Sequence, residues 1–206
     1  MDWIAGVPLA LEPGERSAYS DANYALLARV IELVSGRSFG EFLRDEIIAP
    51  AGLAATGHRG DAATPVPGLA MGHVPVGLRE IEPSSPVDYS ASTGSGSIYS
   101  TASDLLRWHR ALSGDEVLTP ESRALMFRRH VDARGYGWIL DERLGRSKVS
   151  MSGGDGVGFS TEFVHFEGEQ VTVIVLCNLS ISTVPTELAD GLAPLALGEE
   201  STPLRL

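Results

Sequence analysis

The chain has 206 residues, of which 43% are hydrophobic, and its formal net charge at pH 7 is −11. This length is sufficient for a single domain with a sizeable core. The acidic balance argues against a nucleic-acid surface, because phosphate binding needs clustered Lys and Arg. No apolar run is long enough to span a bilayer, and the N-terminus lacks the basic-then-apolar pattern of a signal peptide. We therefore expect no membrane span, and both a cytoplasmic and an exported parent protein stay open.

The first informative stretch, residues 13–24, places a tyrosine directly before a helix. Ser20 and Asp21 are both good N-cap residues, since a side-chain oxygen can accept from the first-turn amides. Gly36 supplies a left-handed stop. Tyr19 is thereby held on a turn with its phenol facing a cleft, although a half-buried aromatic that closes a loop is the alternative. The side chains expected on the buried face of the helix are Leu26, Leu27, Val30, Ile31 and Val34.

A second helix is predicted from Ser38 to about Ile48, since Ser38 and Glu41 form a capping box and Pro50 ends the pattern. Residues 55–97 then lose all periodicity and become rich in Gly, Pro, Ser and Thr. Such a long irregular stretch commonly lies over a functional cleft or is poorly ordered.

Two further helices follow this stretch. Thr101 and Asp104 have the spacing of another capping box, which predicts a helix through Leu112. A fourth helix begins with Thr119 as N-cap and Pro120 in the first helical position. We expect this helix to bury Leu125 and Met126.

The rest of the chain carries strand signals and one closing helix. Strands are predicted over residues 136–140, 148–152, 159–166 and 171–178, and a helix over 183–197. A turn at Gly168 joins the last two strands as a hairpin. Because helices precede a run of antiparallel strands, the pattern predicts an α+β fold in which an antiparallel sheet is flanked by helices. We find no linker, so residues 1–206 are treated as a single domain.

Residues 150–159 form the second informative site, because glycine is dense just after a predicted strand. This density lets the backbone approach another group closely or bend sharply. The functional interpretation is a substrate-binding strand edge with an exposed amide that stabilises an oxyanion. The alternative is a glycine-rich hairpin turn. The glycine spacing does not match the dinucleotide fingerprint, and the five histidines lack metal-ligand spacing, so we expect neither a cofactor nor a metal.

Five motifs follow one another in a fixed order along the chain. They are Tyr19-Ser20-Asp21 within residues 13–53, Gly94-Ser95-Gly96-Ser97-Ile98-Tyr99-Ser100-Thr101-Ala102-Ser103-Asp104-Leu105, Tyr136-Gly137-Trp138, Met151-Ser152-Gly153-Gly154 and residues 173–178. In this order they resemble the serine β-lactamase and penicillin-binding protein superfamily, and most closely its class C β-lactamase, D-aminopeptidase and family VIII esterase-like branch. The resemblance extends over residues 11–179 and implies a β-lactamase/transpeptidase-like fold.

The resemblance implies hydrolysis of a small ester, amide, β-lactam or peptide-like substrate through an acyl-enzyme. In the superfamily the serine of a Ser-x-x-Lys motif attacks a carbonyl, while lysine and tyrosine manage the proton. Tyr19 matches that tyrosine, as general base or proton relay. Asp21 matches a substrate-orienting position that is usually Asn. Met151, Ser152 and Gly153 match the third motif, and Gly154 would offer an amide to the oxyanion hole.

The chain departs from the superfamily pattern in three respects. Lys148 is the only lysine and has Gly145 three residues before it, so the Ser-x-x-Lys motif is absent. Met151 replaces a cationic or ionisable residue, and a thioether cannot attract a carboxylate. Asp21, when ionised, cannot donate to a substrate carbonyl. These departures favour neutral esters over carboxylate-bearing substrates.

From the missing nucleophile motif we expect the C-terminal portion of a serine hydrolase, truncated at its N-terminus and inactive alone. This portion would lack both the N-terminal strands and the Ser-x-x-Lys helix of the superfamily. A non-catalytic relative that binds a ligand or partner through the same cleft is the alternative. Residues 171–178 are rich in β-branched residues and uncharged, which is typical of a central strand. If its neighbouring strand is absent, we expect the chain to self-associate through this edge.

Overall fold

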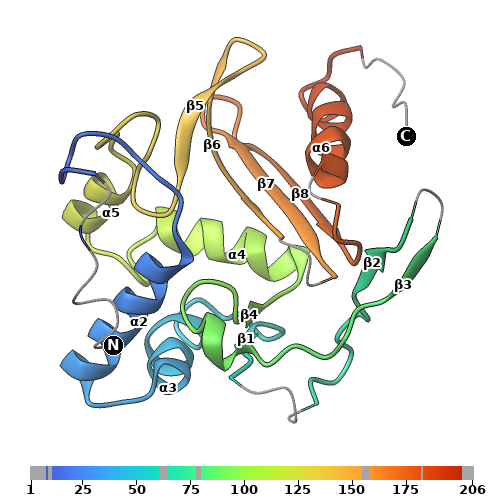
Figure 1. Ribbon diagram of the computed structural model, residues 1–206. Coiled ribbons are helices and arrows are strands. Elements are labelled where there is room, and N and C mark those ends of the chain that lie inside the picture. The colour runs from blue at the N-terminus through green and yellow to red at the C-terminus, as the bar shows by residue number, and fades with distance from the viewer. Residues whose placement is uncertain are drawn as a thin grey trace.

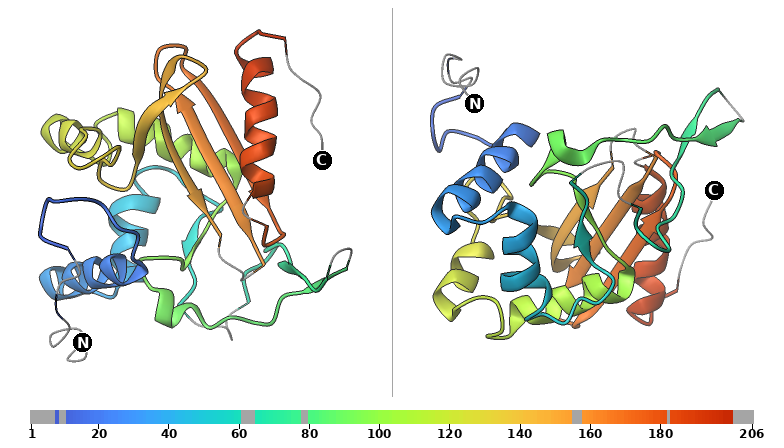
Figure 2. Two further views of the ribbon diagram at one scale, coloured as in Figure 1. Left: turned by 45° about the horizontal axis from the view of Figure 1, so that its top comes forward. Right: turned by 90° about the horizontal axis from the view of Figure 1, so that it is seen from below.

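The structure is a computed structural model that describes residues 8, 11–60, 65–77, 80–154, 158–181 and 183–200. It consists of a four-stranded antiparallel sheet with a helix against each face and a smaller helical part beside one end (Figures 1 and 2). The predicted α+β class is therefore confirmed.

The described elements are helical segments and strands, which alternate in groups along the chain. The helices are α2 (Asp21–Ser35), α3 (Phe39–Leu43), which continues into the π-helical η1 (Arg44–Ile48), the 3-10 turn η2 (Tyr89–Ser92), α4 (Ala102–Ser113), α5 (Pro120–Met126) and α6 (Thr183–Ala196). The strands are β1 (Gly57–His58), β2 (His73–Pro75), β3 (Ile81–Pro83), β4 (Ile98–Tyr99), β5 (Ile139–Arg143), β6 (Arg146–Gly153), β7 (Ser160–Phe166) and β8 (Val171–Cys177).

The four main strands lie in the order β5-β6-β7-β8, so each strand pairs with its neighbours in sequence. The predicted hairpin between the last two strands is confirmed, with Phe166 opposite Val171. The first strand begins three residues later than predicted, because the preceding segment forms a turn. In that turn Gly137 has a φ of 79°, and the Gly135 amide donates to the Trp138 carbonyl at 2.9 Å.

The largest cluster of buried apolar side chains lies between β7, β8 and α6. Val164 and Phe166 are fully buried against Ala189 and Ala193 of the helix. Small helix residues let α6 lie close to the sheet, and burying a side chain such as Phe166 contributes about 1.5–3 kcal/mol. Figure 2 shows α6 running along this side of the sheet. The predicted closing helix is thus confirmed, and it stabilises the sheet.

Helix α4 lies on the opposite face of the sheet, where aromatic rings fill the interface. The centroid of the His109 ring lies 4.0 Å from that of His165 and 5.5 Å from that of Phe163. The Trp138 ring packs against Phe163 in the same cluster. Burial, and to a smaller extent the neighbouring His165, lower the pKa of His109 to about 4. The His109 ring is therefore neutral at pH 7.

The capping box predicted at the start of α4 is only half correct. The Thr101 hydroxyl accepts from the Asp104 amide at 3.2 Å, as a cap should. The Asp104 carboxylate, however, does not return to the cap. It accepts from the Ala55 amide at 2.7 Å and from the Thr56 hydroxyl at 2.9 Å. A contact between residues far apart in sequence thus replaces the local one, and it fixes the start of the irregular segment 55–97 to α4.

Helices α2 and α3 form a second, smaller core. Ala28, Phe39 and Leu43 are its buried members, and the capping box of Ser38 and Glu41 is confirmed. The predicted burial of one α2 face is wrong for most of its residues. The large apolar side chains that α2 exposes are Tyr24, Leu27, Val30, Leu33 and Val34. Nothing in the described part of the chain covers them. In α5, Leu125 is likewise exposed instead of buried.

The irregular segment forms two short antiparallel ribbons. β1 pairs with β4, and Figures 1 and 2 show the β2–β3 hairpin projecting away from the body. Gly94, in the turn before β4, lies so close to α2 that an added Cβ would stand 2.5 Å from the Tyr24 carbonyl oxygen. His73 of β2 bridges to Leu179, just beyond the end of β8. The segment therefore connects the helical part to the sheet.

Candidate active site

The first predicted site residue, Tyr19, lies in the extended segment directly before α2 and is 82% exposed. Its hydroxyl donates to the Asp21 Oδ1 atom at 2.7 Å. Asp21 is the first residue of the helix, and Ser20 is the N-cap but makes no side-chain capping bond. The helix start thus holds a tyrosine and a carboxylate together, two residues apart in sequence. A phenol with an adjacent acceptor is an arrangement suited to proton transfer.

Helix α2 also carries a row of exposed apolar side chains. Leu27, Val30 and Val34 follow at intervals of three and four residues, so they share one side of the helix. Val34 is 83% exposed. A contiguous exposed apolar surface of this kind marks a contact surface in soluble proteins.

The third motif occupies the last part of β6. Met151 lies opposite Phe163, and Gly153 lies opposite Thr161, and both partners belong to the neighbouring strand β7. On the other side of β6, the pairing with β5 ends at Ser150. Residues Met151–Gly153 of β6 therefore extend beyond β5 and pair only with β7. Beyond the β6–β7 ladder, the backbone of Met151, Ser152 and Gly153 makes no hydrogen bond to another described residue. The strand therefore presents an unpaired edge, as the functional interpretation of this motif requires.

Gly154 continues this edge with a backbone that requires glycine. Its φ is 121°, and an added Cβ would lie 2.5 Å from the Phe159 carbonyl oxygen. The residue is exposed at the end of the strand. Residues 155–157 of the glycine-rich motif lie outside the described residues.

The two parts of the predicted site come from different elements. No hydrogen bond among the described residues joins Tyr19 or Asp21 to Met151–Gly154. The assigned roles of Tyr19, Asp21, Met151, Ser152, Gly153 and Gly154 therefore remain predictions.

Lys148, the only lysine, makes its side-chain contacts with residues of the sheet. Its Nζ lies 2.7 Å from Asp141 Oδ1 and donates to Ser150 Oγ at 2.8 Å. Ser150 is buried, so this serine–lysine contact is closed to a substrate. The pair is structural.

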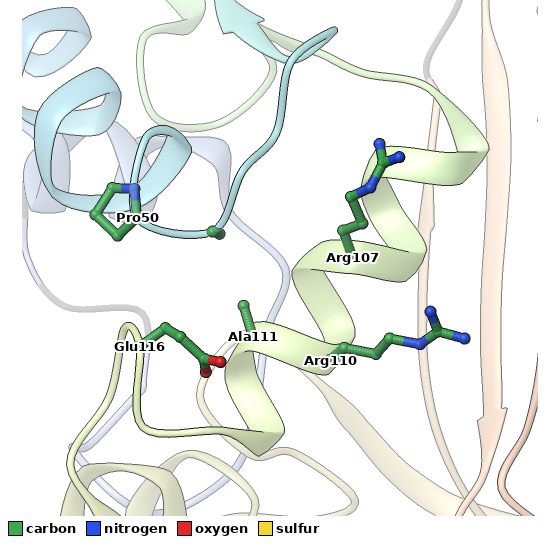
Figure 3. A pocket seen from close by; sticks show the side chains of 6 residues that line it. Pro50, Arg107, Arg110, Ala111 and Glu116 are labelled. Atoms are coloured by element: carbon green, nitrogen blue, oxygen red, sulfur yellow. The ribbon is translucent and has the colours of Figure 1, made fainter.

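An open hollow of about 200 Å³ lies elsewhere, between α4 and the segment after η1. Its lining residues are Pro50, Ala51, Arg107, Arg110, Ala111 and Glu116. Figure 3 shows the Arg110 guanidinium pointing away from Pro50 and Glu116, and Arg107 donates to Asp104 at 2.7 Å. None of the predicted site residues lines this hollow, and it is not the candidate site.

Among the described residues, no cluster of three or more His, Cys, Asp or Glu side chains has a geometry that could hold a metal ion. A search of the same residues finds no helix long and apolar enough to cross a membrane.

Sequence reasoning overlooked Arg59 and Ser97, which lie in the β1–β4 ribbon. Arg59 Nε and Ser97 Oγ are both buried without a hydrogen-bond partner. Ser97 lies in the motif of residues 94–105 without a role assigned to it there, and no motif includes Arg59. The two residues become neighbours only when two segments far apart in sequence pair.

The order of motifs and the sheet with its flanking helices agree with one family. The Beta-lactamase family model matches residues 1–197. The chain therefore belongs to the β-lactamase family of serine hydrolases and penicillin-binding proteins.

Two relatives illustrate this membership. The chain is 29% identical to penicillin-binding protein 4* of Bacillus subtilis over 184 residues, which cover 81% of this chain and 41% of that protein. It is 25% identical to the D-alanyl-D-alanine-carboxypeptidase/endopeptidase AmpH of Escherichia coli over 212 residues, which cover 94% of this chain and 53% of that protein. The chain thus spans about half the length of these relatives.

The fold agrees with solved structures of the same family. A penicillin-binding protein from Bacillus halodurans superposes with a TM-score of 0.77 at 25% sequence identity. The match covers 91% of this chain and 59% of that protein. The β-lactamase/transpeptidase-like fold expected from the sequence is confirmed.

Proposed function

We propose that this chain is the C-terminal, tyrosine-bearing portion of a β-lactamase-like serine hydrolase. The serine nucleophile is contributed by polypeptide outside these residues. The observation that carries this proposal is the Tyr19–Asp21 pair at the start of α2, a helix that also exposes apolar side chains. An apolar segment that covers Leu27, Val30 and Val34 would lie along the helix that begins at this pair.

In the proposed reaction a serine hydroxyl attacks the carbonyl carbon of a small ester, amide or peptide-like substrate. The Tyr19 oxygen accepts the serine proton while its own hydroxyl proton passes to Asp21, and the reverse transfer then protonates the leaving group. The Gly154 amide donates to the oxyanion that forms on the carbonyl. Water then hydrolyses the acyl-enzyme. The substrate class is supported by a relative whose name describes a D-alanyl-D-alanine carboxypeptidase.

The open edge of the sheet supports the same proposal. Among the described strands β8 pairs only with β7, although its two faces are covered by α6 and α4. A strand covered on both faces is typical of the middle of a sheet. The proposal therefore assigns further strands of the parent protein to this edge.

A non-catalytic relative that binds a ligand or partner is the second candidate. It is favoured by Met151, whose thioether cannot supply the charge or the hydrogen-bond donor usual in the third motif. The two candidates differ in one measurement. The hydrolytic proposal predicts that the chain alone turns over p-nitrophenyl acetate no faster than a denatured control. It also predicts saturable turnover once the encoded N-terminal portion is restored. Absence of turnover by the restored protein would favour the binding relative.

A further inference from the structure

The β1–β4 ribbon brings Arg59 and Ser97 face to face. The two strands pair with Gly57 opposite Tyr99 and His58 opposite Ile98. The Arg59 amide continues this ladder by donating to the Ser97 carbonyl at 2.8 Å. Directly opposed residues of an antiparallel pair point to the same side of the ribbon. The Arg59 and Ser97 side chains therefore share one face.

Each of these side chains leaves a buried donor unused. Ser97 is 2% exposed, and its Oγ atom has no hydrogen-bond partner. The Nε atom of Arg59 is buried and likewise without a partner. No carboxylate among the described residues lies within ion-pair distance of this guanidinium, although the chain has 27 acidic residues. An unpaired buried donor of a charged group is costly, and its presence needs an explanation.

Tyr89 holds the arginine in a defined orientation. The Arg59 guanidinium carbon lies 5.1 Å from the centre of the Tyr89 ring. A guanidinium above an aromatic face is stabilised by the ring and keeps its edge of N–H groups available. That edge matches the two oxygens of a carboxylate.

We propose that Arg59 and Ser97 form a binding subsite for the carboxylate of a small molecule, with Tyr89 as the surface beneath the guanidinium. The ribbon contacts α2, the helix that begins just after Tyr19, because Gly94 packs against the Tyr24 carbonyl. That the ligand is a substrate rests on the proposed function. The subsite would supply the positive charge that Met151 lacks, and it would reverse the preference for neutral esters expected from the third motif.

The test uses the 206-residue chain labelled with ¹⁵N in its arginine side chains. The Nε–H resonance of Arg59 is assigned as the one that disappears in Arg59→Lys. Titration with N-acetylglycine should shift this resonance and saturate, because the carboxylate accepts from Nε. The methyl ester of N-acetylglycine, which lacks the charge, should leave it unchanged.

Three variants determine whether the response comes from this subsite. Arg59→Lys keeps the charge but loses the bidentate hydrogen bonding of the guanidinium, so we expect binding of N-acetylglycine to be about tenfold weaker. Ser97→Ala should weaken binding roughly 2–10-fold through loss of one hydrogen bond. Arg110→Gln is the matched control, because it removes an arginine of α4, outside the ribbon, and affinity should not change. Unchanged amide shifts of β1 and β4 in each variant show that the ribbon is intact.

If N-acetylglycine does not shift the Arg59 Nε–H resonance in the folded chain, the proposal is overturned. An equal shift with the methyl ester would also overturn it. A response to inorganic phosphate but not to N-acetylglycine would also overturn the assignment to a carboxylate. None of these results bears on acyl transfer, which is tested separately by ester turnover in the restored protein.

Discussion

The Tyr19 hydroxyl donates a 2.7 Å hydrogen bond to the carboxylate of Asp21, which is the first residue of α2. This contact lies at the surface and does not contribute to either hydrophobic core. The orientation that it gives the phenol agrees with the proposed proton transfer at the helix start. The first prediction tests this interpretation.

Replacing Tyr19 with Phe in the protein with its N-terminal portion restored should lower kcat for a short-chain ester by about 100-fold or more, because the proton relay is lost. Stability should hardly change, since the hydroxyl is exposed. Steady-state kinetics and thermal unfolding measure the two effects. Tyr136→Phe is a matched control, because it removes the hydroxyl of another exposed tyrosine, whose ring stacks on His130. Near-parental turnover in Tyr19→Phe would remove Tyr19 from the mechanism.

The second prediction concerns the buried carboxylate of Asp104. Burial alone would raise its pKa, but hydrogen bonds from Ala55, Thr56 and Arg107 outweigh burial and place the pKa below its usual value. Asp104→Asn must turn an amide N–H toward one of these donors. We expect a loss of about 2–3 kcal/mol in the free energy of unfolding.

Urea denaturation measures this loss, with Arg107→Gln as the control. Arg107 is mostly exposed, so its removal should cost less than about 1 kcal/mol. Equal losses in the two variants would mean that the ion pair, and not the anchoring of segment 55–97, is what Asp104 provides.

The third prediction is a pH dependence that originates at the interface between α4 and the sheet. Burial and the neighbouring His165 lower the pKa of folded His109 to about 4, below its value of about 6.5 in an unfolded chain. The stability that depends on neutral His109 is therefore fully present above pH 6.5. It should be lost progressively as the pH falls toward 4, by about 3 kcal/mol.

His109→Phe keeps a ring in this cluster but cannot be protonated, so its free energy of unfolding should fall less steeply between pH 6.5 and 4. The pKa of His165 is lowered by burial too, and part of the slope should therefore remain. His130→Gln, outside the cluster, should retain the parental slope. An unchanged slope in His109→Phe would show that acid destabilisation arises elsewhere.

The fourth prediction concerns the open edge of β8. Without further strands, the chain alone should associate through this edge. Val173 is only 6% exposed and belongs to the core, so a charge there would unfold the domain. Leu176, at 40% exposed, is the suitable position for a lysine. Light scattering should show association of the parental chain and less association of Leu176→Lys. A parental chain that remains monomeric, with outward β8 amides that exchange rapidly, would contradict association through the edge.

Local signals in the sequence predicted the helix boundaries well. Gly36 ends α2 with a left-handed φ of 69°, and Ser38 and Glu41 form the expected capping box. Both features depend on residues within one helical turn of each other. The sequence also indicated the motif that becomes the unpaired end of β6, because glycine follows a strand there.

Features that depend on distant contacts could not be predicted. Periodicity shows that Val34 and its neighbours form an apolar face of α2, but it does not show whether anything covers that face. Asp104 has the spacing of a capping residue, yet its carboxylate binds a segment about fifty residues earlier. Arg59 belongs to no motif and Ser97 had no role assigned to it within its motif, because the two become neighbours only through strand pairing.

The central claim is that Tyr19 serves a serine nucleophile supplied from outside this chain. Its most direct test is intact-protein mass spectrometry after incubation with a fluorophosphonate, applied to the chain alone and to the protein with its N-terminal portion restored. The account predicts no adduct on the chain alone. It predicts one adduct per molecule on the restored protein, at the serine of a Ser-x-x-Lys motif. A stoichiometric adduct on any serine of the 206-residue chain alone would contradict it.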